Sequence, residues 1–156
     1  MKLLQRPTIS QAWARTSRLP LGNKVFSKMV GRMAPYTGTV GATVLELADG
    51  YCKAELRDRA AVRNHLRSIH AVALMNLGEV CTGLAVMHAV DGHGRGIVTG
   101  LKMEYYKKAR GTITAECRTE LPTAPGPHDH EVTGELRDEA GDLVARVFAT
   151  WKLDLE

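Results

Sequence analysis

The sequence predicts an α+β fold in which one antiparallel sheet packs around a single long buried helix. Apolar residues recur with a period of two before and after residues 69–87, which is typical of strands that bury one face. Residues 69–87 themselves are apolar on nearly every side, as expected of a helix enclosed by other elements. The strand-like segments are joined by short turns, which excludes a doubly wound parallel sheet, because parallel strands need long crossover connections.

The length and composition indicate a single globular domain. The chain has 156 residues, of which 44% are hydrophobic and 24% charged, and this excludes wholesale disorder. We divide it into a helical N-terminal extension, residues 1–34, and a main domain, residues 35–156. No apolar stretch with a cleavage site follows Lys2 and Arg6, so we expect no secretory signal. The most apolar stretch carries Glu79 at its centre, so we expect no membrane-spanning helix.

The extension is predicted to form two helices over residues 9–32 that cover a face of the sheet. Apolar residues such as Trp13 and Phe26 recur there at helical spacing. Pro20 separates the two helices because proline lacks the backbone N–H that a helix needs. Pro35 is expected to end the second helix.

Residues 40–44 and 52–56 alternate between apolar and other side chains, and they are predicted to form a β-hairpin. Asp49 and Gly50 stand between them. This dipeptide is typical of a type I′ turn, in which both central residues have a positive φ.

The long helix is predicted over residues 69–87, with Ser68 as its N-cap. Three glycines within residues 92–96 indicate a turn after it. The period of two then returns, and the proline-rich residues 122–127 are expected to form a loop. The remaining strands are predicted at residues 97–106, 112–118, 132–138 and 144–155.

Cysteine spacing and charge exclude several classes of site. Cys52, Cys81 and Cys117 lie far apart without metal-ligand spacing, so we expect reduced buried thiols, a cytoplasmic protein and no metal site. His65 and His70 are five residues apart, which places them on different faces of a helix. The net charge of +4 would suit an anionic ligand. Basic residues are spread along the chain and aromatic residues make up only 5%, so we expect no nucleic-acid interface.

Glu79 is the main candidate for a functional residue. A carboxylate in an apolar helix is costly to desolvate unless it is paired, protonated or facing a polar cavity. At 100° per residue, Asn76 and Gly83 share its helix face. Two interpretations remain open: a group in a functional cleft, or a structural glutamate bound to a strand amide or an arginine.

Asn64, His70 and Glu79 have the spacing Asn-x5-His-x8-Glu, between a predicted hairpin and a run of predicted strands. This pattern resembles the hotdog superfamily, in particular PaaI-like acyl-CoA thioesterases and a thioesterase-like branch beside them. Residues 105–111 also resemble that family's strand end, with an aromatic, a basic residue, a turn and a glycine. The resemblance covers residues 40–155. It implies a curved antiparallel sheet wrapped around the helix, in a homodimer or dimer of dimers with substrate between subunits.

The resemblance also implies a mechanism. A thioester carbonyl would sit at the helix N-terminus, with the N–H of Ala71 as the main oxyanion donor. Glu79 would attack directly or activate water, Asn64 would orient the water or Glu79, and His70 would hold the helix start or the thioester region. The candidates for contacts with coenzyme A phosphates are Lys107, Lys108 and Arg110, and the alternative for these three is a solvated strand end.

The predicted function is therefore hydrolysis of an acyl-CoA or acyl-carrier thioester, with no cofactor beyond the coenzyme A of the substrate. The family usually has His-Gly-Gly at the helix start, where this chain has His70, Ala71 and Val72. These side chains would narrow the approach of a thioester. A non-catalytic acyl-CoA-binding protein is therefore one alternative, and a hydratase or dehydratase that uses His70 as acid and base is another.

Overall fold

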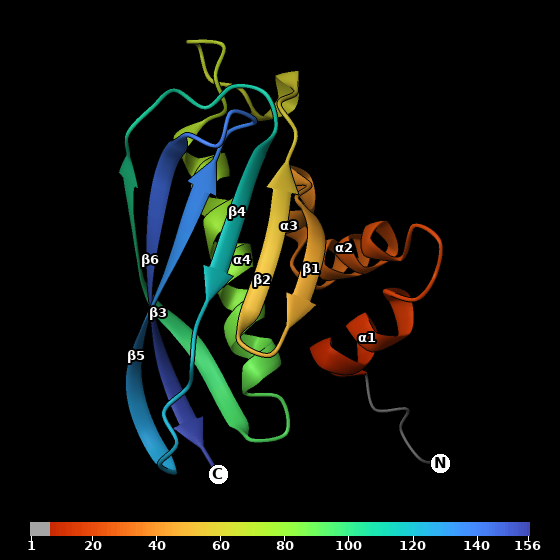
Figure 1. Ribbon diagram of the computed structural model, residues 1–156, viewed down its shortest axis with the longest axis vertical. Coiled ribbons are helices and arrows are strands. Elements are labelled where there is room, and N and C mark those ends of the chain that lie inside the picture. Colours follow the sequence, from red (N-terminus) through yellow and green to blue (C-terminus); the bar gives the residue numbers. More distant parts are fainter. Residues whose placement is uncertain (1–6) are drawn as a thin grey trace.

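The computed structural model describes residues 7–156 and confirms the α+β architecture (Figure 1). A six-stranded antiparallel sheet curves around the long helix α4, Ala71–Ala89, with the strand order β1-β2-β4-β5-β6-β3. Three shorter helices lie beside the β1 edge of this sheet. The other elements are α1 Ile9–Thr16, α2 Gly22–Met33, α3 Pro35–Val40, β1 Thr43–Ala48, β2 Tyr51–Leu56, the 3₁₀ helix η1 Ala60–Val62, β3 Gly94–Tyr105, β4 Ile113–Arg118, β5 Gly126–Arg137 and β6 Leu143–Leu155.

Helix α4 forms the core of the molecule. By length and composition it could cross a membrane, yet 67% of its most apolar window is buried within the protein, as in the core helix of a globular domain. It approaches β5 and β6 closely because Gly78 has no side chain. A Cβ at Gly78 would lie 2.9 Å from Val147, and one at Gly134 on β5 would lie 3.0 Å from the same side chain. Both glycines therefore let the helix lie directly on the sheet.

The N-cap of α4 is His70, and the prediction of Ser68 was wrong. His70 has extended backbone angles, and its Nδ1 accepts a hydrogen bond from the Val72 N–H at 3.1 Å. Ser68 is held in the preceding loop, where its hydroxyl donates to Asn64 at 3.2 Å. Ile69 donates its backbone N–H to Ala109 at 2.8 Å. Because Ser68 and Ile69 form hydrogen bonds outside the helix, α4 begins only after His70.

The N-terminal helices confirm the two-helix prediction and add a third helix. They do not cover a face of the sheet as predicted, because they lie beside its β1 edge and against α4. The rings of Trp13 in α1 and Phe26 in α2 meet edge to face, with centroids 5.0 Å apart. Pro35 follows α2 and is also the first residue of α3. Proline is tolerated at this position because the first N–H groups of a helix have no partner within the helix. Residues 40 and 42 are therefore not part of the first strand, which begins at Thr43. The domain division at residue 34 stays a prediction.

The hairpin of β1 and β2 is confirmed, but its predicted turn type was wrong. A type I′ turn requires a positive φ at both central residues. Gly50 has φ +63°, but Asp49 does not have a positive φ. Glycine is needed at position 50 for a second reason. A Cβ there would lie 2.1 Å from the Thr119 carbonyl oxygen, because the Thr119 N–H donates to Gly50 at 2.7 Å.

Strands β3 and β5 begin earlier than their sequence patterns indicate. β3 starts at Gly94, inside the glycine-rich segment that was predicted to be a turn, and β5 starts at Gly126, inside the predicted loop. Both strands pair with β6, where Leu155 faces Gly94 on one side and Gly126 on the other. Pairing with the long β6 thus extends β3 and β5 beyond the residues that alternate between apolar and polar.

The three cysteines are buried and unbridged, which confirms the predicted reduced thiols. Cys52 and Cys117 face each other on β2 and β4, and the Cys81 thiol of α4 donates to the Cys52 carbonyl at 3.2 Å. Burial raises the pKa of Cys117 to about 12, so this thiol carries almost no thiolate at neutral pH.

We therefore expect native protein to resist a thiol reagent such as 5,5′-dithiobis(2-nitrobenzoate) at pH 8. All three thiols should react after denaturation in guanidinium chloride, which provides the control. Release of one equivalent of chromophore from native protein within seconds would contradict this packing.

Candidate active site

The N-terminus of α4 is the first part of the candidate site. The His70 backbone N–H donates a hydrogen bond to the Val62 carbonyl oxygen at 2.8 Å, and His70 Nδ1 accepts one from the Val72 N–H. Within residues 7–156 the Ala71 N–H has no acceptor. This N–H is therefore available to a ligand at the positive end of the helix dipole.

Tyr105 holds the first turn of α4 from the opposite side. Its hydroxyl, at the end of β3, donates to the Ala71 carbonyl oxygen at 2.9 Å. The sequence analysis named Tyr105 only as an aromatic strand end and missed this contact. The β3 edge is thus tied to the helix N-terminus.

A cavity of about 540 Å³ opens beside this helix end. It lies between α3, the segment around η1 and the first turn of α4. Val72, whose side chain is 52% exposed, forms part of its wall. The lining residues are Tyr36, Thr39, Val40, Ala61, Val62, Arg63, His70, Val72 and Ala73.

Glu79 is half-buried on α4 and has no ion pair or side-chain hydrogen bond among the residues the structure describes. The structure thus excludes the arginine-bound interpretation for this part of the chain. Burial raises the pKa of the Glu79 carboxyl. A carboxylate with a raised pKa is a stronger base than one in bulk water, as a general base requires.

The neighbours of Glu79 on the same helix face are Asn76 and Gly83. The Asn76 amide donates to Thr37 of α3 at 3.1 Å, while its Oδ1 is buried without a partner in the described chain. A Cβ at Gly83 would lie 3.4 Å from the Trp151 ring and 3.8 Å from Glu79 Oε1. Gly83 therefore leaves room for the indole and the carboxylate to approach each other.

Asn64 organises the loop that precedes α4. Its Oδ1 accepts hydrogen bonds from the backbone N–H groups of Leu66, at 2.9 Å, and Ser68, at 3.3 Å. The third bond, from the Ser68 hydroxyl, completes this loop. The structure places Asn64 before the helix start, and its role toward water or Glu79 stays a prediction.

Glu79 and the Ala71 N–H lie too far apart in one chain to act on the same carbonyl group. Eight residues of helix separate them, and a rise of 1.5 Å per residue gives about 12 Å along the axis. Reacting and stabilising groups must both lie about 3 Å from the reacting atoms. One copy of the chain therefore provides two halves of a site without joining them.

The three predicted phosphate-binding cations have different surroundings. Lys107 bonds to Asp138 at 2.5 Å and to Asp142 at 2.6 Å, so it holds the turn between β5 and β6. Lys108 and Arg110 are exposed and form no ion pair within residues 7–156. Only these two present unpaired positive charge near the end of β3.

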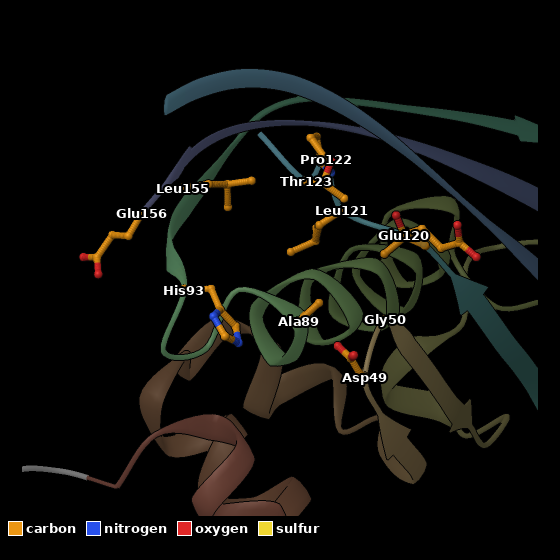
Figure 2. Close-up of a pocket in the computed structure, with 11 residues that line it drawn as sticks. Asp49, Gly50, Ala89, His93, Glu120, Leu121, Pro122, Thr123, Leu155 and Glu156 are labelled. Atoms are coloured by element: carbon orange, nitrogen blue, oxygen red, sulfur yellow. The ribbon is translucent and has the colours of Figure 1, made fainter. Parts of the chain in front are cut away.

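A second cavity, of about 410 Å³, lies at the other end of α4. Figure 2 shows it lined by Asp49, His93, Glu120 and Glu156 around Ala89. Three carboxylates at the negative end of a helix dipole disfavour a developing oxyanion. In the described chain no three histidine, cysteine, aspartate or glutamate side chains lie close enough together to hold a metal ion. The α4 N-terminus is thus the better candidate for thioester chemistry.

Residues 22–153 match the family described as Domain of unknown function (DUF4442). The chain belongs to the DUF4442 family. No curated protein matches it.

Solved structures show the same fold. The structural-genomics protein APC5556 is 26% identical, covers 95% of this chain and 99% of its own, and has a TM-score of 0.80. A Pseudomonas aeruginosa protein of unknown function, PA5026, titled a probable thioesterase, is 23% identical, with coverages of 88% and 97% and a TM-score of 0.76. The phenylacetic acid degradation protein PaaI of Thermus thermophilus is 21% identical, with coverages of 76% and 97% and a TM-score of 0.65. The predicted hotdog fold is confirmed, and the predicted resemblance to PaaI holds at the level of the fold.

The Glu79→Gln substitution should stabilise the protein at high pH. Folding raises the pKa of the Glu79 carboxyl. The protonated group therefore contributes stability when the pH is below its pKa in the unfolded chain, and this stability is lost as the pH rises through its pKa in the folded protein. Glutamine stays neutral, so we expect the variant's Tm to exceed that of the original protein by about 2 °C at pH 8. The difference should vanish at pH 4. Both values can be measured by scanning calorimetry.

Glu131 provides the matched control, because it is exposed on β5 and forms no ion pair in the described chain. Glu131→Gln should leave the pH dependence of Tm unchanged. A lower Tm for Glu79→Gln at pH 8 would mean that the charged carboxylate stabilises the fold.

Proposed function

We propose that this protein is a thioesterase that hydrolyses an acyl-CoA or acyl-carrier thioester. The observation that carries the proposal is Glu79, a desolvated carboxylate, on the same helix as the Ala71 N–H. Among residues 7–156 the carboxylate has no counter-ion and the N–H has no acceptor. Structures of the same fold include a probable thioesterase. The shared fold alone does not define the reaction, and the proposal depends on these two groups.

The oxyanion donor follows from the capping geometry. His70 accepts the Val72 N–H, and this leaves the Ala71 N–H to bind the carbonyl oxygen of a thioester. The helix dipole favours negative charge at this position. Tyr105 holds the Ala71 peptide from its carbonyl side, so the donor is already in place when substrate binds.

Two copies of the chain would join the halves of the site. Strand β3 is a 12-residue edge strand, and its other edge has no partner within the described chain. Leu101 and Tyr105 of β3 and Val72 of α4 are all large exposed hydrophobic residues near this edge. Pairing of two β3 edges about a twofold axis would cover them and bring the two α4 helices side by side in opposite directions. Glu79 of one copy would then approach the Ala71 N–H of the other.

The proposed reaction needs only water as a co-reactant. Glu79 removes a proton from water, and the oxygen adds to the carbonyl carbon of the thioester. The negative charge that develops on the carbonyl oxygen is stabilised by the Ala71 N–H. When this tetrahedral intermediate collapses, the carbon–sulfur bond breaks and Glu79 returns the proton to the thiolate. The products are a carboxylic acid and a free thiol.

The other named residues support this reaction in the proposal. Asn64 orients the water or the carboxylate, and His70 maintains the helix start. Lys108 and Arg110, which are exposed and unpaired in the described chain, bind phosphates of coenzyme A. Lys107 would have to break its ion pairs with Asp138 and Asp142 before it could bind a phosphate.

A non-catalytic acyl-CoA-binding protein is the second candidate. The exposed Val72 side chain, in the wall of the cavity at the α4 N-terminus, favours it. Such a side chain would hinder the approach of a thioester while leaving the neighbouring apolar surface free for an acyl chain.

The Glu79→Gln variant should lose at least about 100-fold in hydrolysis rate, because removal of a general base typically has an effect of this size. Release of free thiol can be followed with short, medium, long and aromatic acyl-CoAs. Glu131→Gln is again the control and should retain full activity. Tight binding of acyl-CoA without thiol release would instead identify a binding protein.

Mixed dimers test whether the site is shared. Ala71→Pro removes the proposed donor at the first helical position, where proline is tolerated, and the extended His70 backbone suits a following proline. This variant and Glu79→Gln should each be inactive alone. After unfolding together and refolding, about a quarter of the sites would be intact, because half of the dimers are mixed and each has one complete site.

The recovered activity should match that fraction, with each variant refolded separately as the control. No recovery from dimers shown to be mixed would contradict a site built from two copies.

A further inference from the structure

A groove of about 930 Å³ lies between α2, α3 and the β1 edge. Its size lies within the range of small-molecule sites. The apolar part of its lining comes from Val30 of α2, Val44 and Leu45 of β1, and Val80 of α4. In Figure 1 the helices that form one wall stand beside the hairpin of β1 and β2, outside the sheet that encloses α4.

The groove is preformed by a close crossing of α2 and α3. A Cβ at Gly31 would lie 2.8 Å from Gly38, and one at Gly38 would lie 2.7 Å from the Gly31 carbonyl oxygen. Arg59 fixes the end of α3 by donating to the carbonyl oxygens of Thr39 and Val40 at 2.9 and 2.7 Å. The wall therefore stands in place without a ligand.

Two polar side chains of the groove, Ser27 and Glu55, are already paired. Ser27 donates its hydroxyl to the Asn23 carbonyl at 2.6 Å and accepts the Val44 N–H at 2.8 Å. Glu55 is the one acidic residue in the lining, and it pairs with Arg57 at 3.5 Å. An occupant of the interior would thus meet apolar surface and no unpaired carboxylate.

Positive charge borders the groove on one side. Lys24, Lys28 and Arg32 follow one another at intervals of four residues, so they share one side of α2, and all three line the groove. They are exposed and form no ion pair in the part of the chain that the structure describes. A row of unpaired cations thus lies along an apolar surface.

This row belongs to a wider separation of charge in the sequence. The first 45 residues contain seven of the 21 basic residues and none of the 17 acidic ones, so they carry +7 while the remainder carries −3. The basic residues are spread along the chain, as the sequence analysis states, and the separation of charge arises because the first 45 residues contain no acidic ones. Averaged over the whole segment, the first 45 residues therefore attract a negative ligand more strongly than the remainder of the chain does.

We propose that the groove binds an amphipathic anion, with one long acyl chain in the apolar interior and an acidic head group on Lys24, Lys28 and Arg32. Charge complementarity selects the head group, and the apolar lining selects the chain. The ligand can be a free fatty acid, an acyl-CoA or a lysophospholipid, since all three share this chemistry. The proposal does not depend on thioesterase activity.

Isothermal titration calorimetry of the full chain with dodecanoate tests the proposal. We expect saturable binding of one molecule per chain, with dodecyl maltoside, which has an uncharged head, binding at least about tenfold more weakly. Lys28→Glu should weaken dodecanoate binding about tenfold, because it places a negative charge beside the head group. Ala42→Phe should weaken it as well, by filling the groove from its lining.

Lys152→Glu is the matched control, because Lys152 is an exposed, unpaired cation on β6. It makes the same charge change and should leave binding unaltered. Circular dichroism and Tm show whether each variant is folded. Competition with a dodecyl-CoA thioether and with lysophosphatidylglycerol then identifies the source of the acyl anion, and displacement by either supports the groove.

Three results would overturn the proposal. One is the absence of saturable dodecanoate binding, and another is unchanged binding in both folded groove variants. The third is binding to phosphatidylglycerol vesicles without binding of dodecanoate. That result would assign the basic extension and its exposed apolar residues to a membrane surface. These residues are Leu19, Leu21, Val25, Met33 and Tyr36.

Discussion

The enclosure of α4 by the sheet is the constraint on which the rest of the structure depends. A helix that is apolar on nearly every side must be covered all round, and the curved sheet and the N-terminal helices cover most of it. The side that carries Glu79 is covered least. The same desolvation that stabilises the helix therefore raises the pKa of Glu79, the one carboxyl group in its middle. Burial of the helix thus makes this carboxylate a stronger base.

The ends of α4 are defined by polar contacts and not by its composition. His70 caps the first turn, Tyr105 binds the Ala71 carbonyl, and Asn64 closes the loop before them. These bonds leave the Ala71 N–H at the positive end of the helix without an acceptor among residues 7–156. They also set the distance of about 12 Å to Glu79, so the rigidity of one helix makes a second copy of the chain necessary for the proposed chemistry.

Most of the fold follows from periodicity, and the exceptions have identifiable causes. The alternation in β6 and the apolar character of α4 are strong signals because burial acts on many residues in succession. Pro35 was interpreted as a helix end, although proline is equally suited to a first turn, and this hid α3. Gly94 and Gly126 resemble turn residues, yet pairing with β6 extends the strands through them. Such pairing is decided between segments that are distant in sequence.

The sequence alone determined the fold class, the central helix, the reduced cysteines and the placement of the Glu79 carboxyl in an apolar helix, because each depends on local spacing or on the cost of burying a group. Only the tertiary structure decided that Glu79 has no arginine partner within the described chain, that Lys107 is bound to two aspartates, and that α2 and α3 form a groove. These features arise where elements meet. A pattern along one segment carries no information about which partner another segment brings to it.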